Sequence, residues 1–318
     1  MQAIILAAGS STRTYPLTLT KPKPLLKVAG KTLLEHNLDQ LEGLVEEVIL
    51  IIGYKRDMIL DFINGLKYNF KIKTIEQEEQ KGTGHALSLC KSRIKDRFIL
   101  LMGDDLYKRQ DIERCLKHDY SLLAKEVDNP ERFGIIVEHN NKVWEIIEKP
   151  QLVVSNLANC ALYVLDKSIF ETLTKLKRSK RGEYEVTDAI KEIRTKGVNI
   201  EKAGFWLSIG YPWDLLKADR SLRKENMIAK TSKNKGEVEN SFIDENCMIE
   251  EGANIRNSIV YKNTKIKKGS LIEDSVIGEN CIIEGKLRSE ENIISIVKKA
   301  PVRVAKLGAI IADNVKAE

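Results

Sequence analysis

The last third of the chain is built on a repeat of 17 residues, and no other feature of the sequence constrains the fold as strongly. Three successive segments align on this period and read SFIDENCMIEEGANIRN, SIVYKNTKIKKGSLIED and SVIGENCIIEGK. Aliphatic residues recur within them at intervals of 6, 6 and 5 residues: Ile243, Ile249, Ile255, Val260, Ile266, Ile272, Ile277 and Ile283. Three short strands per repeat, each turning one aliphatic side chain inward, predict the stacked coils of a triangular parallel β-helix.

Polar residues repeat in the same phase as the aliphatic ones. Serine recurs every 17 residues at Ser241, Ser258 and Ser275, and asparagine recurs at the same interval at Asn246, Asn263 and Asn280. The alternative, an ordinary run of strands and turns, gives no reason for this phase. The stretch that follows leaves the period, and LGAIIADN near its end predicts one further partial coil.

The first 105 residues follow a different pattern. Apolar runs of strand length, AIILAA, EVILIIG and RFILLMG, alternate with segments whose apolar residues fall at helical spacing. Strands that are apolar throughout are typical of a parallel sheet covered on both faces, so we expect a doubly wound, Rossmann-like α/β fold. Residues 133–165 read instead as an antiparallel insertion, with HNNK as a turn. We expect one domain over residues 1–228 and the β-helix over 229–318.

Composition limits the kind of partner. The chain has 318 residues, a net charge of +6 and only 6% aromatic residues, which suits a small anionic substrate better than nucleic acid. Five scattered cysteines form no CxxC pair, which argues against a zinc site or a disulfide framework. The apolar stretch at residues 3–8 is too short for a signal peptide or a membrane span. We therefore expect a cytoplasmic protein that contacts neither nucleic acid nor membranes.

The loop after the first predicted strand is a candidate phosphate site. Gly9 begins a run of small residues that ends at Arg13, and backbone N–H groups of such a loop can approach phosphate oxygens closely. By itself this run is also compatible with a plain turn. In TKPKPLL two prolines fix the backbone around Lys23, which favours a positioned lysine over a solvated one.

Two carboxylates end the third apolar run. Because Mg²⁺ is commonly held by one or two carboxylates together with phosphate oxygens and water, Asp104 is the natural ligand. Asp105 could assist or could instead cap the turn. We expect Mg²⁺ as the cofactor.

These motifs together carry a resemblance. LAAGSSTRTYPLTLTKPKPLLKVAGKTLLEH resembles the opening signature of the sugar-1-phosphate nucleotidyltransferases. The likeness continues in order through EQEEQKGTGHAL, LMGDD, ERFGIIVE, IIEKP, SNLANCALYVLD, RGEYEVTDAI and GFWLSIGYPWDLL, to about residue 220. It then reaches the left-handed β-helix that many members carry.

The resemblance implies that a sugar-1-phosphate oxygen attacks the α-phosphorus of a nucleoside triphosphate and releases pyrophosphate. It assigns Arg13 to the leaving phosphates, Lys23 to the α-phosphate and Lys149 to the sugar phosphate. The catalytic residues that it implies are Arg13, Lys23 and Asp104. Such a reaction needs cations and rigid positioning more than covalent help. The resemblance also implies that the nucleotide is bound by Leu6, Ala8, Gly9, Ser10, Gln77, Gln80, Gly82 and Thr83. By resemblance, the last four of these contact the pyrimidine ring.

By the same resemblance, Gly134, Glu148 and Asn159 contact the sugar. The wording of QKGTGHA and ANCAL resembles the N-acetylglucosamine-1-phosphate uridylyltransferase branch, whereas SNLA and RGEYEVTDA resemble the glucose-1-phosphate thymidylyltransferase branch. The substrates implied are therefore UTP or dTTP with glucose-1-phosphate or N-acetylglucosamine-1-phosphate. The chain departs from the family where many members have a second metal carboxylate or Asn, because Ser208 stands there and a hydroxyl is a weak Mg²⁺ ligand.

Two other functions stay open at this point. A non-catalytic regulatory subunit on the same scaffold is favoured only by Ser208, since Arg13 and Lys23 are both present. A mannose-1-phosphate guanylyltransferase is disfavoured by QKGTGHA. The β-helix has no histidine to act as base for acetyl transfer, so we expect it to serve in structure or in assembly of a homo-oligomer.

Overall fold

The computed structural model describes residues 1–179 and 181–317, and these divide into two compact units. The first contains Met1–Gly9 and His36–Ser208, and the second contains Ser10–Glu35 and Ile209–Glu318. We call Ser10–Glu35 the signature segment. It carries the first family motif, and it packs with the C-terminal part of the chain.

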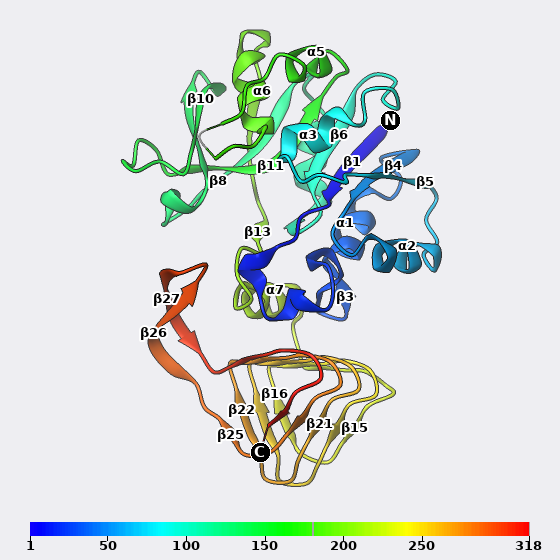
Figure 1. Ribbon diagram of the computed structural model, residues 1–318, viewed down its shortest axis with the longest axis vertical. Helices are drawn as coiled ribbons and strands as arrows, with labels where there is room; N and C mark the ends of the chain where they lie inside the picture. Colours follow the sequence, from blue (N-terminus) through cyan, green and yellow to red (C-terminus); the bar gives the residue numbers. More distant parts are fainter. Residues whose placement is uncertain (180, 318) are drawn as a thin grey trace. The chain divides into compact units, whose positions relative to one another are not determined.

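The first unit is built on one main sheet, and its strands run in the order β5-β4-β1-β6-β11-β8-β12-β10-β9 (Figure 1). Their bounds are β1 Gln2–Ala7, β4 Glu47–Ile52, β5 Lys71–Glu76, β6 Phe98–Met102, β8 Ser121–Glu126, β9 Gly134–His139, β10 Lys142–Glu148, β11 Leu157–Leu165 and β12 Asn199–Lys202. A small second sheet pairs β7 (Asp105–Tyr107) with β13 (Trp206–Ser208).

The parallel core lies where the apolar runs predicted it. β1 pairs in parallel with β4 and with β6, and every residue of β1 is buried. One face carries Ile4 and Leu6, which belong to a core cluster with residues of α3 (Thr83–Ser88), α5 (Ile169–Leu173) and α6 (Val186–Glu192). Because both faces of these strands are covered, nearly all their side chains must be apolar.

The expected antiparallel region is present, and its strands are part of the main sheet. β11 pairs antiparallel with β6 and β8, and β9 pairs with β10, so these strands extend the main sheet. The HNNK turn is confirmed, with Asn140 and Asn141 both at positive φ as a tight hairpin turn requires. Three further α-helices lie earlier in the described chain, between β3 (Lys31–Thr32) and β8: α1 Leu33–Leu41, α2 Arg56–Asn64 and α4 Arg109–Cys115.

The second unit contains the predicted β-helix. Its strands form parallel sheets in the orders β14-β17-β20-β23-β28, β15-β18-β21-β24-β29 and β16-β19-β22-β25, consistent with a left-handed β-helix (Figure 1). The bounds are β14 Met227–Ile228, β15 Lys233–Asn234, β16 Glu237–Glu239, β17 Phe242–Ile243, β18 Met248–Ile249, β19 Asn254–Arg256, β20 Ile259–Val260, β21 Lys265–Ile266, β22 Leu271–Glu273, β23 Val276–Ile277, β24 Ile282–Ile283, β25 Lys286–Leu287, β28 Ile310–Ile311 and β29 Lys316–Ala317. The eight aliphatic residues of the repeat are all buried in its core.

A hairpin explains why the sequence leaves the 17-residue period. β26 (Glu290–Val297) and β27 (Ala300–Leu307) pair antiparallel and leave the coil stack (Figure 1). The chain then returns, and β28 and β29 pair with β23 and β24, which confirms the further partial coil.

The signature segment consists of short elements and contacts α7 (Asp214–Leu222) in the same unit, where the N–H of Ala29 donates to Oδ1 of Asp219 at 2.9 Å. Its elements are the 3₁₀ turns η1 Thr12–Thr14, η2 Leu17–Leu19 and η3 Lys23–Leu25, and the strands β2 Lys27–Val28 and β3 Lys31–Thr32. No helix in the described part of the chain combines the length and the apolarity that spanning a membrane requires.

Candidate active site

The first candidate region is the carboxyl edge of the parallel strands. Leu6 lies in register with Met102 on the neighbouring strand, and its carbonyl accepts a hydrogen bond from the N–H of Gly103 at 2.9 Å. The loop that starts at Gly9 and the turn that carries Asp104 therefore leave adjacent strand ends. Ligands of open parallel sheets bind at this edge.

Glutamine side chains hold the loops at this edge. The Nε2 of Gln80 donates to the carbonyl of Ala8 at 2.9 Å, which fixes the start of the glycine loop. Gln77 is only 5% exposed, and its Nε2 donates to Gly82 O at 3.1 Å and lies 3.0 Å from Nδ1 of His85. Burial, followed by the nearby Lys81 charge, lowers the pKa of His85, so a neutral imidazole accepts from Gln77.

The segment Gly82–Gly84, at the start of α3, packs against a segment one hundred residues further along the chain. The N–H of Gly84 donates to Tyr184 O at 2.7 Å, and the N–H of Val186 donates to Oγ1 of Thr83 at 3.1 Å. Gly82 has φ of +103°, and a Cβ there would lie 2.5 Å from the carbonyl oxygen of Tyr184. Only glycine fits this contact, which joins the QKGTG and EYEVTD motifs.

Asp104 and Asp105 have different surroundings at the turn after β6. Asp105 is buried, and its Oδ2 accepts from Nε1 of Trp206 at 3.1 Å, so it serves the structure of the turn. Asn37 holds the same turn, donating through Nδ2 to Met102 O at 3.2 Å and to Asp105 O at 2.9 Å. The sequence analysis did not single out Asn37, because only the fold brings this residue of α1 beside the turn.

The donor set at this turn suits a metal that is held mostly by its substrate. Ser208 pairs with Asp105 across β13 and β7, so the structure places the serine next to the residue that follows Asp104. Within the described residues, no group of three or more His, Cys, Asp or Glu side chains could hold a metal ion. One carboxylate with phosphate oxygens and water is a set that Mg²⁺ accepts and that zinc or calcium seldom uses.

The predicted sugar residues cluster at the other end of the sheet. Gly134 pairs with Glu148 across β9 and β10, and a Cβ on Gly134 would lie 2.8 Å from Oε2 of Glu148. Asn159 lies at an irregularity of β11, where its Oδ1 accepts from Ala161 N at 3.0 Å and its Nδ2 donates to the Tyr163 hydroxyl at 2.7 Å. Its amide still has one N–H and one lone pair for a ligand.

Lys149 follows directly and has an unusual backbone. Its φ is +48°, a left-handed conformation that costs a non-glycine residue about 1–3 kcal/mol, and its N–H donates to Phe133 O at 2.9 Å. The hairpin thereby fixes the direction in which this exposed side chain leaves the sheet.

Sequence reasoning missed a group beside this cluster. Arg181 Nη1 lies 3.2 Å from Oε1 of Glu148 and 3.4 Å from Oε1 of Glu185. Burial raises the pKa of Glu185, which is 7% exposed, and the Arg181 charge opposes that rise. The motif RGEYEVTDAI contains both residues, but the sequence alone could not show that it faces Glu148.

The remaining predicted residues, Ser10, Arg13 and Lys23, lie in the signature segment and hence in the second unit. Arg13 is exposed, with its guanidinium carbon 5.9 Å from the centre of the Tyr211 ring. Lys23 lies in η3 and is only 4% exposed. Lys23 is thus both flanked by prolines, as the sequence shows, and buried.

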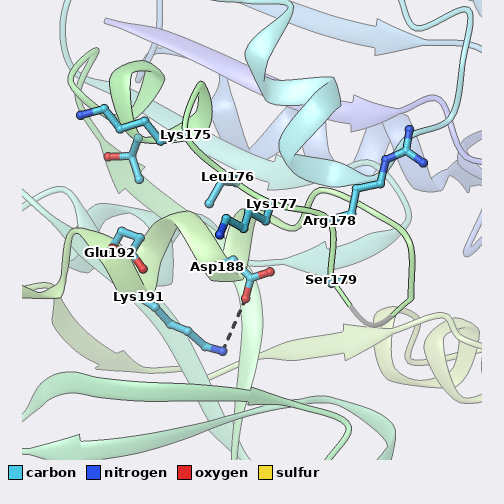
Figure 2. Close-up of a pocket in the computed structure, with 9 residues that line it drawn as sticks. Lys175, Leu176, Lys177, Arg178, Ser179, Asp188, Lys191 and Glu192 are labelled. Atoms are coloured by element: carbon cyan, nitrogen blue, oxygen red, sulfur yellow. Dashed lines mark hydrogen bonds and ion pairs between the residues drawn. The ribbon is translucent and has the colours of Figure 1, made fainter.

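A pocket of about 590 Å³ lies elsewhere in the first unit, next to α5 and α6 (Figure 2). Its lining includes Lys175, Lys177, Arg178 and Lys191, and the last of these lies 3.5 Å from Oδ1 of Asp188. Figure 2 shows the Lys175 and Arg178 side chains extending in opposite directions. The lining contains none of the residues predicted for the nucleotide or the sugar.

Comparisons with known proteins extend over both parts of the chain. The nucleotidyl transferase family model matches residues 2–225, and the GMPPB C-terminal domain model matches residues 225–318. The bifunctional protein GlmU of Methanococcus maripaludis is 41% identical over 80% of this chain and 62% of its own length. GlmU of Methanocaldococcus jannaschii is 42% identical over 80% of this chain and 61% of its own length, so the chain spans about three fifths of these relatives.

Two further proteins match over nearly all of their own length. The UTP–glucose-1-phosphate uridylyltransferase AglF of Haloferax volcanii is 36% identical, over 72% of this chain and 99% of AglF. A Bacillus anthracis crystal structure assigned as a glucose-1-phosphate thymidylyltransferase, in complex with a sucrose, is 29% identical with a TM-score of 0.65, covering 72% of this chain and 98% of that one. Together with the fold and the ordered motifs, these matches establish that the chain belongs to the sugar-1-phosphate nucleotidyltransferase family.

Proposed function

We propose that this protein is an enzyme that transfers the nucleotidyl group of UTP or dTTP to glucose-1-phosphate or N-acetylglucosamine-1-phosphate. A phosphate oxygen of the sugar-1-phosphate attacks the α-phosphorus, the bond between that phosphorus and the β-phosphate oxygen breaks, and pyrophosphate leaves. The observation that carries this proposal is the meeting of the glycine loop and the Asp104 turn at adjacent strand ends of one parallel sheet. A triphosphate needs N–H donors and a metal-binding carboxylate near one another.

Each predicted residue has a role in this proposal. The nucleotide is bound by Leu6, Ala8, Gly9, Ser10, Gln77, Gln80, Gly82 and Thr83. The sugar phosphate is bound by Gly134, Glu148, Lys149 and Asn159. Arg13 and Lys23 supply positive charge to the leaving phosphates and the α-phosphate, where charge grows in the transition state.

Enzymes of this family generally use a divalent metal ion. We propose that the ion is Mg²⁺ and that Asp104 holds it, with phosphate oxygens and water completing its ligands. Ser208 then contributes at most a hydroxyl. Mg²⁺ neutralises phosphate charge when it is bound.

Other features of the protein also stay predictions. They are the division into residues 1–228 and 229–318, self-association as a homo-oligomer, and a cytoplasmic location. Self-association is supported by the exposed strand edges that a stack of parallel coils presents at its ends.

Pyrophosphate release tests the proposed reaction. UTP, dTTP and GTP are each paired with glucose-1-phosphate, N-acetylglucosamine-1-phosphate and mannose-1-phosphate, with and without Mg²⁺. We expect metal-dependent release with UTP or dTTP and one of the first two sugars. Release with GTP and mannose-1-phosphate alone would support the guanylyltransferase, and no release with any pair would support the non-catalytic subunit.

Lys23→Ala tests the mechanism. Loss of a preorganised cation at the α-phosphate should lower kcat by roughly 10²-fold. Lys31→Ala is the matched control, because Lys31 is an exposed lysine of the same segment. An unchanged rate in Lys23→Ala contradicts the assigned mechanism.

A further inference from the structure

A buried lysine joins the signature segment to the β-helix. Lys21 is 5% exposed, and its Nζ forms ion pairs with Glu279 and, at 3.1 Å from Oδ2, with Asp313. The same Nζ lies 5.5 Å from the centre of the Tyr261 ring. Glu279 and Asp313 occupy one corner of successive coils, each directly before an asparagine.

The charges at this contact balance. Lys262 Nζ lies 3.5 Å from Glu279, so two lysines face two carboxylates. Asp313 is further engaged, because its Oδ1 accepts from Glu279 N at 2.7 Å and the Thr20 hydroxyl donates to its other oxygen. Removing Lys21 would leave the buried Asp313 carboxylate without its ion-pair partner, whereas Glu279 would keep Lys262.

A second contact lies on the other side of Lys23. Lys27 Nζ is 3.0 Å from Oδ1 of Asp244, and the Tyr261 hydroxyl donates to Lys27 O at 2.9 Å. The backbone of the segment is therefore tied to the β-helix two residues before Lys23 and four residues after it. Between these points lie Pro22 and Pro24, whose rings restrict the backbone further.

From these contacts we propose that the last coils of the β-helix position the catalytic lysine. Lys21, Glu279 and Asp313 are positioning residues. None of them is assigned a contact with either substrate. They hold in place the stretch of backbone that carries Lys23. The inference rests on the proposed function, because it takes Lys23 to act on the α-phosphate.

The expected size of the effect follows from geometry. A displacement of about 1 Å at a reacting group can cost up to roughly 10²-fold in rate. The ties at Lys27 and the two prolines remain when the Lys21 contact is lost, so we expect a smaller loss, about tenfold in kcat. KM for the sugar phosphate should change little, since its predicted contacts lie in strands of the main sheet or, for Lys149, directly after one.

The experiment compares Asp313→Asn, Glu279→Gln and Lys21→Met with a matched control. Glu245→Gln is that control, because Glu245 is an exposed carboxylate at the same corner two coils earlier. We expect the first three variants to lose about tenfold in kcat, Lys21→Arg to recover most of the rate, and the control to keep it. Circular dichroism and the urea midpoint are measured on the same samples, so that kcat is expressed per folded molecule.

Epistasis separates positioning from mere stability. Because Lys21 acts through Lys23, adding Lys21→Met to Lys23→Ala should lower the rate of the single Lys23→Ala variant by less than about twofold. If the two losses multiply, or if the rate per folded molecule is unchanged in Asp313→Asn and Lys21→Met, the inference is overturned. If instead Lys23→Ala alone keeps full activity, the proposed mechanism fails first.

Discussion

At the scale of single residues, the structure shows why particular types stand where they do. Gln77 is buried and gives its amide hydrogens to Gly82 and His85, so it shapes the loop that follows β5. Asn37 does the same for the turn that carries Asp104. Amides suit such places because they donate and accept without charge.

His85 makes this arrangement sensitive to pH. Its pKa is lowered in the folded protein by burial, so below the ordinary value of 6.5 the unfolded chain binds more protons than the folded one. The free energy of unfolding should therefore fall as the pH is lowered through and below that value. Urea titrations at about pH 7.5 and about pH 5.5 should show a smaller fall for His85→Gln, which cannot titrate. Equal falls in both proteins would contradict this prediction.

At the scale of elements, the β-helix depends on corners as much as on its aliphatic core. Asn246, Asn263, Asn280 and Asn314 all have positive φ, between 55° and 64°. Their side chains form a ladder, in which Nδ2 of Asn263 donates to Oδ1 of Asn280 at 3.0 Å. Asparagine adopts the left-handed conformation more readily than most residues and can also bond its counterpart in the next coil.

Substitutions of Asn263 separate these two contributions. Asn263→Gly keeps the backbone conformation and loses the ladder, whereas Asn263→Ala loses both. We expect the free energy of unfolding to decrease in the order asparagine, glycine, alanine, with alanine lower than glycine by about 1 kcal/mol. Urea unfolding followed by circular dichroism measures the order, and an alanine variant as stable as the glycine variant would show that backbone strain is unimportant there.

At the scale of the whole molecule, each of the two compact units is made of two separate stretches of the chain. The signature segment carries Arg13 and Lys23, and it belongs with residues 209–318 rather than with the main sheet. The positions of Arg13 and Lys23 should therefore depend on the stability of the β-helix in the same unit.

Ile266→Ala tests this dependence. Ile266 is fully buried in the β-helix core, and its truncation should cost about 2–5 kcal/mol. We expect the urea concentration that halves activity to fall together with the midpoint seen by circular dichroism. Ile266→Val, with a cost of about 0.5–1.5 kcal/mol, should give a smaller shift in both. If the circular dichroism midpoint falls while the activity midpoint stays fixed, the prediction is wrong, because activity would then not depend on the stability of the β-helix.

The sequence by itself determined the periodic parts of this protein. Repeats of 17 residues and uniformly apolar runs each satisfy only one kind of packing, so the β-helix and the parallel sheet could be predicted from side-chain spacing. The ordered motifs likewise identified the family, and they predicted which residues form the candidate site.

Only the tertiary structure decided which distant residues meet. The contacts of Glu148 with Arg181, of Thr83 with Val186 and of Lys21 with Glu279 join parts of the chain separated by 33, 103 and 258 residues. No local pattern encodes them, because such contacts depend on how loops close and how elements pack. The same holds for the hairpin at β26 and β27, whose alternation of exposed and covered residues fits no coil of the β-helix. Spacing along the chain therefore determined the elements, and packing decided their partners.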